Sequence, residues 1–164
     1  NVEQALCNLE QAGVDTPEAI LATVPESLEL LVRPAGFFRQ KTRALRELAD
    51  FFQHYEAEFI VSEETWILRR RLLAVRGVGE ETADSILLYA FGKPLFVIDA
   101  YTRRVAQRHL ALDGTMPYAR LQQVFMAALP AEVAIYQEYH ALLVEFCKNS
   151  CRKNGCGTHC GELR

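Results

Sequence analysis

Two carboxylates and a group of cysteines are the residues of this 164-residue chain whose types and spacing could do chemistry. Asp99 follows the apolar run Leu-Phe-Val-Ile, Glu81 comes two residues after a Gly-Val-Gly turn, and four of the five cysteines fall within the last eighteen residues. A fixed carboxylate can stabilise a developing positive charge or activate a water molecule. Clustered thiols can bind a metal ion or an iron–sulfur cluster.

The position of Asp99 in the sequence predicts a structural role by itself. The residue lies directly before Ala-Tyr-Thr-Arg-Arg, where a helix is expected to begin. An aspartate there caps the helix by accepting a hydrogen bond from a free backbone N–H group, and the helix dipole stabilises its ionised form. Capping alone would explain why an aspartate is found at position 99, so a catalytic role for Asp99 needs further support.

The stretch Gly77-Val78-Gly79 predicts a tight turn between two helices. Glycine tolerates a positive φ and has no Cβ, so consecutive backbone N–H groups can converge on an anion there. The helix that starts after Gly79 adds the positive end of its dipole, which favours a phosphate group. A plain helix–helix turn with glycine caps is the alternative for so short a pattern.

The C-terminal cysteines are separated by three, four and three residues; they are Cys147, Cys151, Cys156 and Cys160. The first two lie one helical turn apart, so we expect their thiols on one face of a helix. No secretory signal is visible, and crowded thiols without one indicate a metal or cluster site rather than disulfides. Four thiolates suit either zinc or an iron–sulfur cluster.

The elements that position these residues are predicted to be helical, which makes the fold all-α. Apolar residues recur three and four apart over most of the chain, as on one face of a helix. Helices are expected over residues 1–11, 39–55, 80–91, 100–110, 117–129 and 131–147. Asp15 or Thr16 and Ser62 are expected caps. The only strand candidate is the run Leu95–Asp99, which is five residues long.

The composition fits a globular protein that lies outside the membrane. The chain is 50% hydrophobic with a formal charge of −3, and no apolar run approaches the ~20 residues of a membrane span. Lysines and arginines nevertheless gather in local groups, which can form a basic face on a weakly charged protein.

The glycine turn and the aspartate together resemble a known family. The pattern Leu-x4-Gly-Val-Gly-x2-Thr-Ala is the signature of the helix-hairpin-helix motif, which grips DNA backbone phosphates, and Ala90, Pro94 and Asp99 extend the match. The chain therefore resembles the endonuclease III (HhH-GPD) superfamily of DNA glycosylases. The resemblance implies a two-lobed, all-α fold, with a helical barrel lobe over 1–99, the hairpin at about 68–90, and a C-terminal lobe over 100–164. It also implies a monomer in the bacterial cytoplasm, associated with the nucleoid.

The resemblance also implies a reaction. In the superfamily the aspartate matching Asp99 faces the sugar of the extruded nucleotide, which makes it catalytic. Bifunctional members carry a lysine at the position of Glu81, and its amine forms a Schiff base that leads to strand cleavage. A carboxylate cannot do so. The expected activity is therefore monofunctional removal of a base by hydrolysis, with lyase activity absent.

A second segment points to the substrate. "VRPAGFFRQKTRALRELADFF" is similar to a segment of bacterial 3-methyladenine DNA glycosylases, which implies an alkylated purine in double-stranded DNA. Phe37, Phe38 and Tyr101 are candidates to stack on the cationic base, although core packing is the alternative for each phenylalanine. The expected DNA contacts are Gly77, Val78, Gly79, Thr82, Arg103 and Arg104.

Many superfamily members hold a [4Fe–4S] cluster after the helix that carries Cys147. Cys151 falls where the first family ligand is expected, but the later spacings differ from the family pattern, so a compressed cluster with Cys147 as a ligand, zinc, and free thiols stay open. We also expect the superfamily's N-terminal part to precede this chain in a longer protein. The alternatives to alkylated-purine excision are an endonuclease III-like or mismatch glycosylase and a non-catalytic DNA-binding module.

Overall fold

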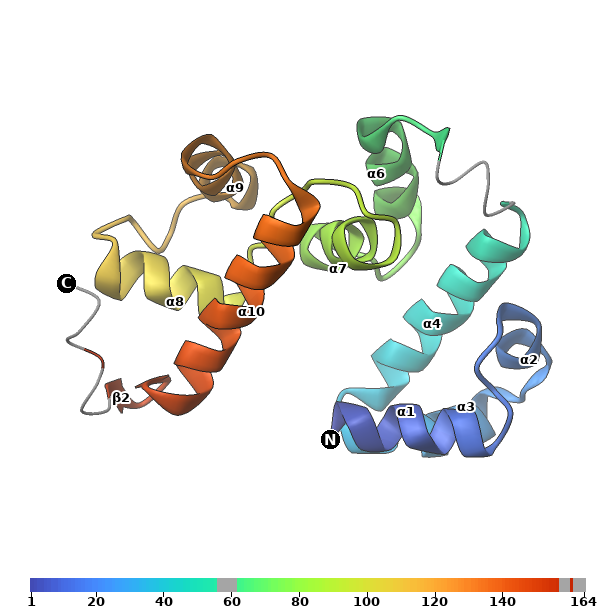
Figure 1. Ribbon diagram of the computed structural model, residues 1–164. Helices are drawn as coiled ribbons and strands as arrows, with labels where there is room; N and C mark the ends of the chain where they lie inside the picture. Colours follow the sequence, from blue (N-terminus) through green and yellow to red (C-terminus); the bar gives the residue numbers. More distant parts are fainter. Residues whose placement is uncertain (56–61, 157–159, 161–164) are drawn as a thin grey trace. The chain divides into compact units, whose positions relative to one another are not determined.

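The computed structural model describes residues 1–55, 62–156 and 160, with Cys156 described for its backbone alone. These residues form two compact units, Asn1–Gly79 and Glu80–Arg164 (Figure 1). Nearly all the regular structure is helical, which confirms the all-α fold. The sequence placed the boundary after residue 99, whereas residues 80–99 pack within the second unit.

The first unit consists of short helices and one longer one. Its elements are α1 (Val2–Gln11), α2 (Pro17–Ala22), α3 (Pro25–Val32), η1 (Arg33–Ala35), α4 (Phe38–Gln53) and α6 (Thr65–Ala74). Thr16 caps α2, since its Oγ1 accepts a hydrogen bond from the Ala19 N–H at 3.2 Å. The expected cap at Ser62 is wrong, because α6 begins three residues later with Glu64 at its N-cap.

Helix α4 organises the packing of α2 and α3 (Figure 1). Its apolar face joins a buried cluster made of Leu9, Val14, Ile20, Leu28, Val32 and Ala49. Arg46, on α4, donates from its guanidinium group to the carbonyls of Ile20 at 3.1 Å and Thr23 at 2.7 Å. These carbonyls lie at the C-terminal end of α2, where free acceptors need a donor. At least one arginine of the basic groups is therefore structural.

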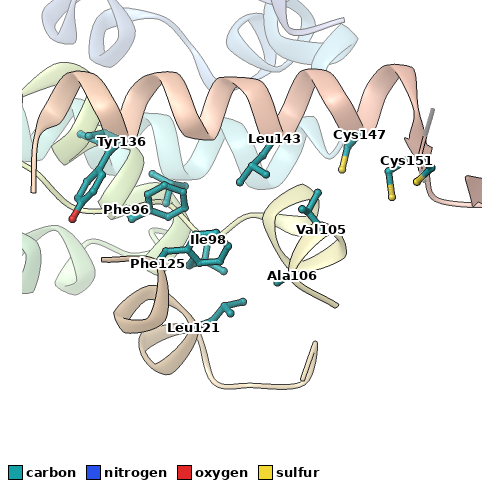
Figure 2. Packing of buried hydrophobic residues seen from close by; sticks show 13 residues of the cluster. Phe96, Ile98, Val105, Ala106, Leu121, Phe125, Tyr136, Leu143, Cys147 and Cys151 are labelled. Carbon is teal, nitrogen blue, oxygen red and sulfur yellow. The ribbon is translucent and has the colours of Figure 1, made fainter. Parts of the chain in front are cut away.

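The second unit surrounds a larger apolar core. Its helices are α7 (Glu80–Ser85), the π-helical turn η2 (Ile86–Ala90), α8 (Ala100–His109), α9 (Tyr118–Ala128) and α10 (Val133–Asn149). Phe96 lies at the centre of this core, where its ring stacks on Phe125 with centroids 4.8 Å apart and meets the edge of Tyr136 (Figure 2). All three rings are at least nine-tenths buried, and such aromatic pairs add stability beyond their buried area.

Residues Leu95–Ile98 cross this core without pairing into a sheet. All four are buried, at 2% exposure or less. Since buried backbone groups need partners, side chains of α9 and its N-cap region take the place of a neighbouring strand. The Gln122 amide donates to the Phe96 carbonyl at 2.7 Å, and the Ile98 N–H donates to the Tyr118 hydroxyl at 3.2 Å. The strand candidate is therefore an extended segment held by side chains.

The only strands among the described residues form a small hairpin after α10. β1 (Cys151–Arg152) pairs antiparallel with β2 (Gly155–Cys156), with Cys151 opposite Cys156. The sequence pattern did not predict this pairing, since two-residue strands are too short for a period-two signal. In the described part of the chain, no helix has the length and apolar character needed to span a membrane.

Candidate active site

Asp99 lies at the N-terminus of α8, at the end of the buried segment Leu95–Ile98. Its Oδ1 atom accepts a hydrogen bond from the Thr102 N–H at 2.7 Å, so the predicted helix cap is confirmed. The side chain keeps only 12% of its exposure. Because Tyr118 and Gln122 hold the preceding residues, both the position and the direction of the carboxylate are fixed by the fold.

The second oxygen of Asp99 faces His140. His140 comes from the middle of α10, and its Nε2 atom lies 3.5 Å from Asp99 Oδ2. On the other side of the ring, Nδ1 lies 2.7 Å from the hydroxyl of Tyr89. Tyr89 belongs to η2, and π-helical turns occur often at functional sites. Three elements far apart in the sequence therefore place a phenol, an imidazole and a carboxylate in a row.

Glu81 is the second carboxylate of the site, and its environment differs from that of Asp99. Burial raises the pKa of the Glu81 carboxyl, and the negative charge of Asp99 raises it further, although His140 acts in the opposite direction. The residue as a whole is exposed, so solvent screens part of these effects. Glu81 therefore holds its proton more readily than an ordinary glutamate.

For Asp99 the balance has the opposite sign. Burial alone would raise the pKa of its carboxyl, but the interactions with His140 and with Thr102 outweigh burial and hold the pKa below its usual value. The surroundings therefore move the pKa values of the two carboxyl groups apart. Asp99 favours its ionised form more strongly than an ordinary aspartate does.

The Gly-Val-Gly turn connects α6 with α7 in the sequence, and its glycines serve different purposes. Gly77 has a φ of +90°, and a Cβ there would lie 3.2 Å from the Ala44 Cβ. Gly79 has no positive φ, and a Cβ added there would meet nothing within 4 Å beyond its chain neighbours. Val78 is buried, and Thr82 is exposed. Gly77 is thus needed by the fold, whereas the fold does not require a glycine at 79.

Arg103 and Arg104, the expected DNA contacts on α8, both have partners within the second unit. Arg103 donates to the Met116 carbonyl at 2.7 Å and so holds the loop before α9. Arg104 donates to the Cys151 carbonyl at 2.9 Å, and its guanidinium lies 5.5 Å from the centre of the Tyr101 ring. Contact of either arginine with DNA stays a prediction.

The three candidate stacking aromatics have different surroundings. Phe37 is 81% exposed and has a φ of +47°, a conformation that a residue with a Cβ rarely adopts. Phe38 packs against the core of the first unit, and Tyr101 packs against the core of the second. Phe37 is therefore the one whose ring is available to a ligand without any rearrangement.

The C-terminal thiols lie close to His109, which the sequence pattern did not indicate as a ligand. Nε2 of His109 lies 3.2 Å from Cys160 Sγ, and the donor atoms of His109, Cys151 and Cys160 all lie within 4.8 Å of one another. Cys147 is buried beside Cys151, and burial together with that neighbouring thiol raises its pKa. Figure 2 shows the sulfurs of Cys147 and Cys151 turned to the same side. The side chain of Cys156 and all of His159 lie outside the described residues.

This donor set fits a metal site. Thiolates and imidazole are the preferred ligands of zinc, and thiolates are those of iron–sulfur clusters. The Arg108 guanidinium donates to Cys151 Sγ at 3.5 Å and so orients this sulfur within the group. A group bound by Cys147, Cys151 and Cys160 would tie the end of α10 to the chain that follows it and so stabilise the fold.

Comparison with known proteins defines the class. The family described as HhH-GPD superfamily base excision DNA repair protein matches residues 1–131, a range that includes the glycine turn and Asp99. The chain belongs to this superfamily.

Individual relatives agree with that membership. The DNA repair glycosylase candidate MJ1434 of Methanocaldococcus jannaschii is 40% identical over 164 residues, which cover 98% of this chain and 74% of the relative. Endonuclease III of Sulfolobus acidocaldarius is 27% identical over 143 residues, covering 87% of this chain and 62% of the relative. The chain thus spans less than two thirds of that endonuclease.

A solved structure resembles this fold closely. The H. pylori 3-methyladenine DNA glycosylase MagIII, bound to 1,N6-ethenoadenine, superimposes with a TM-score of 0.75 at 28% identity. The match covers 88% of this chain and 75% of the glycosylase. The two-lobed, all-α architecture expected from the sequence is confirmed.

His140, Tyr89 and His109 were not predicted from the sequence. Each lies more than 40 residues along the chain from the residue that it contacts, so no local spacing links the two. His140 faces Asp99, the predicted cap, only because α10 packs against α8 in the folded protein.

Proposed function

We propose that this protein is a monofunctional DNA glycosylase that removes an alkylated purine from double-stranded DNA by hydrolysis and leaves an abasic site. The observation that carries the proposal is the fixed carboxylate of Asp99, which accepts from the Thr102 N–H at 2.7 Å and faces His140 at the end of a buried segment. No lysine stands at position 81 to supply an amine for a Schiff base.

The chemistry follows from the charge of the substrate. The bond between C1′ and the ring nitrogen breaks, its electron pair leaves with the cationic base, and the base departs neutral. Positive charge then develops on the sugar, where the fixed carboxylate of Asp99 stabilises it. Water adds to C1′ and gives a proton to the solvent. A cationic leaving group needs little help from an acid, so a single ionised carboxylate is sufficient.

Recognition is assigned to two surfaces. Phe37 offers an exposed ring for stacking on a cationic base. The Gly-Val-Gly turn and the N-terminus of α7 offer backbone N–H groups to a phosphate. The relation to a 3-methyladenine glycosylase supports the choice of an alkylated purine, while the relation to endonuclease III keeps other lesions in the test.

A panel of duplexes tests the substrate. Single-turnover base release is measured on duplexes that carry an alkylated adenine, an alkylated guanine, an adenine mismatch or a uracil or thymine mismatch. The proposal expects release of alkylated purines only. Faster release from a mismatch duplex would assign the protein to that class, and binding without release from any duplex would make it a DNA-binding module.

For the C-terminal thiols we propose a [4Fe–4S] cluster as the first choice and zinc as the second. Cys147, Cys151, Cys156 and Cys160 are the proposed ligands, with the described thiols buried as a cluster requires. A brown protein with broad visible absorbance and bound iron and sulfide would support the cluster. A colourless protein with about one zinc per chain would support the second choice.

A further inference from the structure

The row formed by Tyr89, His140 and Asp99 has a role that the capping of α8 does not explain. Asp99 Oδ1 is sufficient for the cap, since it accepts from the Thr102 N–H. Oδ2 faces His140, whose Nε2 atom lies 3.5 Å away, in addition to the interactions of the carboxylate with Thr102. Both side chains keep only 12% of their exposure, so little water competes for the contact.

The hydrogen atoms of His140 follow from its neighbours. Nδ1 lies 2.7 Å from the Tyr89 hydroxyl, which can donate its proton to that nitrogen. In that tautomer Nε2 carries the ring proton and points it at Asp99. The opposite tautomer would turn a lone pair of Nε2 towards a carboxylate, which is unfavourable. Among the described residues, the buried Nε2 makes no contact that meets the full geometry of a hydrogen bond, and the acceptor that it faces is Asp99 Oδ2 at 3.5 Å.

We propose that His140 is the positioning residue of the reaction, which holds Asp99 ionised and directed at the sugar, and that Tyr89 fixes the tautomer of His140 for this purpose. The proposal rests on the proposed glycosylase activity. It makes no claim of proton transfer, since the proton stays on Nε2 throughout. A contact of 3.5 Å in the free protein agrees with this role, because catalytic hydrogen bonds often tighten only when substrate binds.

Charged and polar groups face the imidazole from several elements. Asp99 faces it from the start of α8, Glu81 from α7, and Tyr89 from η2. On α10 itself, Glu145 and Lys148 line a groove of about 410 Å³ next to His140. Asp99 is the group closest to Nε2, and its pKa is lowered by His140, whereas the effect of His140 on Glu81 is smaller than those of burial and of Asp99.

Replacing His140 with Leu tests the proposal through the pH profile. Without the ring N–H, only the interactions with Thr102 oppose the effect of burial, so the pKa of Asp99 should rise. Base release depends on the ionised form, and the acid limb of the rate profile should therefore move to higher pH. At neutral pH we expect a rate lowered by about 10-fold or more. A 13C NMR titration of Asp99 in the DNA-free protein should show the same upward movement.

Two more variants separate positioning from folding. His140→Gln keeps an N–H donor and should recover much of the rate and of the parent pH profile. Gln137→Leu is the matched control on α10, because its amide donates to the Leu88 carbonyl at 3.0 Å and does not touch Asp99. It should lower the melting temperature and leave the acid limb in place.

Tyr89→Phe gives the sharpest result. Loss of the hydroxyl removes the group 2.7 Å from Nδ1 that favours a proton on Nε2, so a neutral ring can turn an unprotonated Nε2 towards Asp99. Tyr89→Phe should therefore lower the rate of base release, and 15N NMR of His140 in the DNA-free protein should show less of the tautomer with the proton on Nε2. A variant with the parent rate and the parent tautomer would remove Tyr89 from the proposal.

The outcomes separate this inference from the proposed function. If the parent releases no base from any duplex, the proposed function fails. If the parent is active while His140→Leu keeps the parent acid limb and the parent Asp99 titration, the positioning role is wrong and the glycosylase assignment stands.

Discussion

The surroundings of Asp99 and of Phe37, the residues proposed for the reaction and for recognition, differ in how far the protein itself fixes the side chain. The Asp99 carboxylate lies at the end of a buried segment, one oxygen bound to a helix N-terminus and the other facing His140. Phe37 lies in the turn before α4, 81% exposed and in a left-handed conformation. The first group has its partners inside the protein, so its charge and direction are set before substrate arrives.

The backbone of Phe37 is the N-cap of α4, but its ring is 81% exposed. Exposing a large apolar ring brings no stability in water, and a residue with a Cβ incurs a conformational cost for a positive φ. A base stacked on the ring, as proposed above, would explain why the ring is exposed. The fold therefore fixes the Asp99 carboxylate through contacts within the protein and leaves the Phe37 ring open to a ligand.

The largest expected effect concerns Asp99. Asp99→Asn keeps the size of the side chain and much of its capping ability, so the free energy of unfolding should change by no more than ~1 kcal/mol. The negative charge beside the sugar is lost, and base release should fall about 10²-fold or more. Binding of a lesion duplex, measured by fluorescence anisotropy, should match that of the parent or exceed it. A variant that released base at the parent rate would reduce Asp99 to a helix cap.

Phe37→Ala should weaken recognition of the damaged base with little change in folding. Loss of one base–aromatic stack is expected to reduce affinity for a lesion duplex about 10-fold or more. Phe38→Ala is the matched control, since Phe38 packs against the core of the first unit. The control should lower the melting temperature and keep the preference for lesion over undamaged duplex. The opposite pattern would move the stacking role from Phe37 to Phe38.

Gly79→Val should weaken binding to damaged and undamaged duplexes by the same factor, because phosphate contacts carry no lesion preference. The open space around Gly79 predicts that this variant folds normally. Gly77→Val is its counterpart, and its positive φ and the nearby Ala44 predict a loss of stability instead. A change in lesion preference with unchanged affinity for undamaged DNA would contradict the phosphate role of Gly79.

What the sequence could predict was decided by how local each feature is. The helix of residues 100–109 and its aspartate cap depend on neighbours within one turn, and both are confirmed. The cap at Thr16 follows the same rule. The prediction of a cap at Ser62 was wrong. The residues around Ser62 fit a cap as well as those around Thr16 do, but α6 begins at Thr65, after Glu64.

Contacts between residues far apart in the chain could not be predicted from the sequence. His140 meets Asp99 across 41 positions of the chain, and His109 meets Cys160 across 51. Leu95–Ile98 has the composition of a strand, but the hydrogen-bonding partners of its backbone are side chains from α9, not another strand. The spacing of apolar residues does not predict such contacts, because they form only when the helices pack together.

The most direct test of the account asks how the sugar is attacked. The protein is incubated with a duplex that carries an alkylated purine, with and without sodium borohydride, and the DNA strand is examined before and after alkali. If Asp99 supports hydrolysis and Glu81 stands in place of a lysine, no Schiff base forms. We then expect free base, a DNA strand that breaks only in alkali, and no covalent protein–DNA adduct. Efficient trapping by borohydride together with strand cleavage before alkali would contradict it, since both require an amine nucleophile that forms a Schiff base.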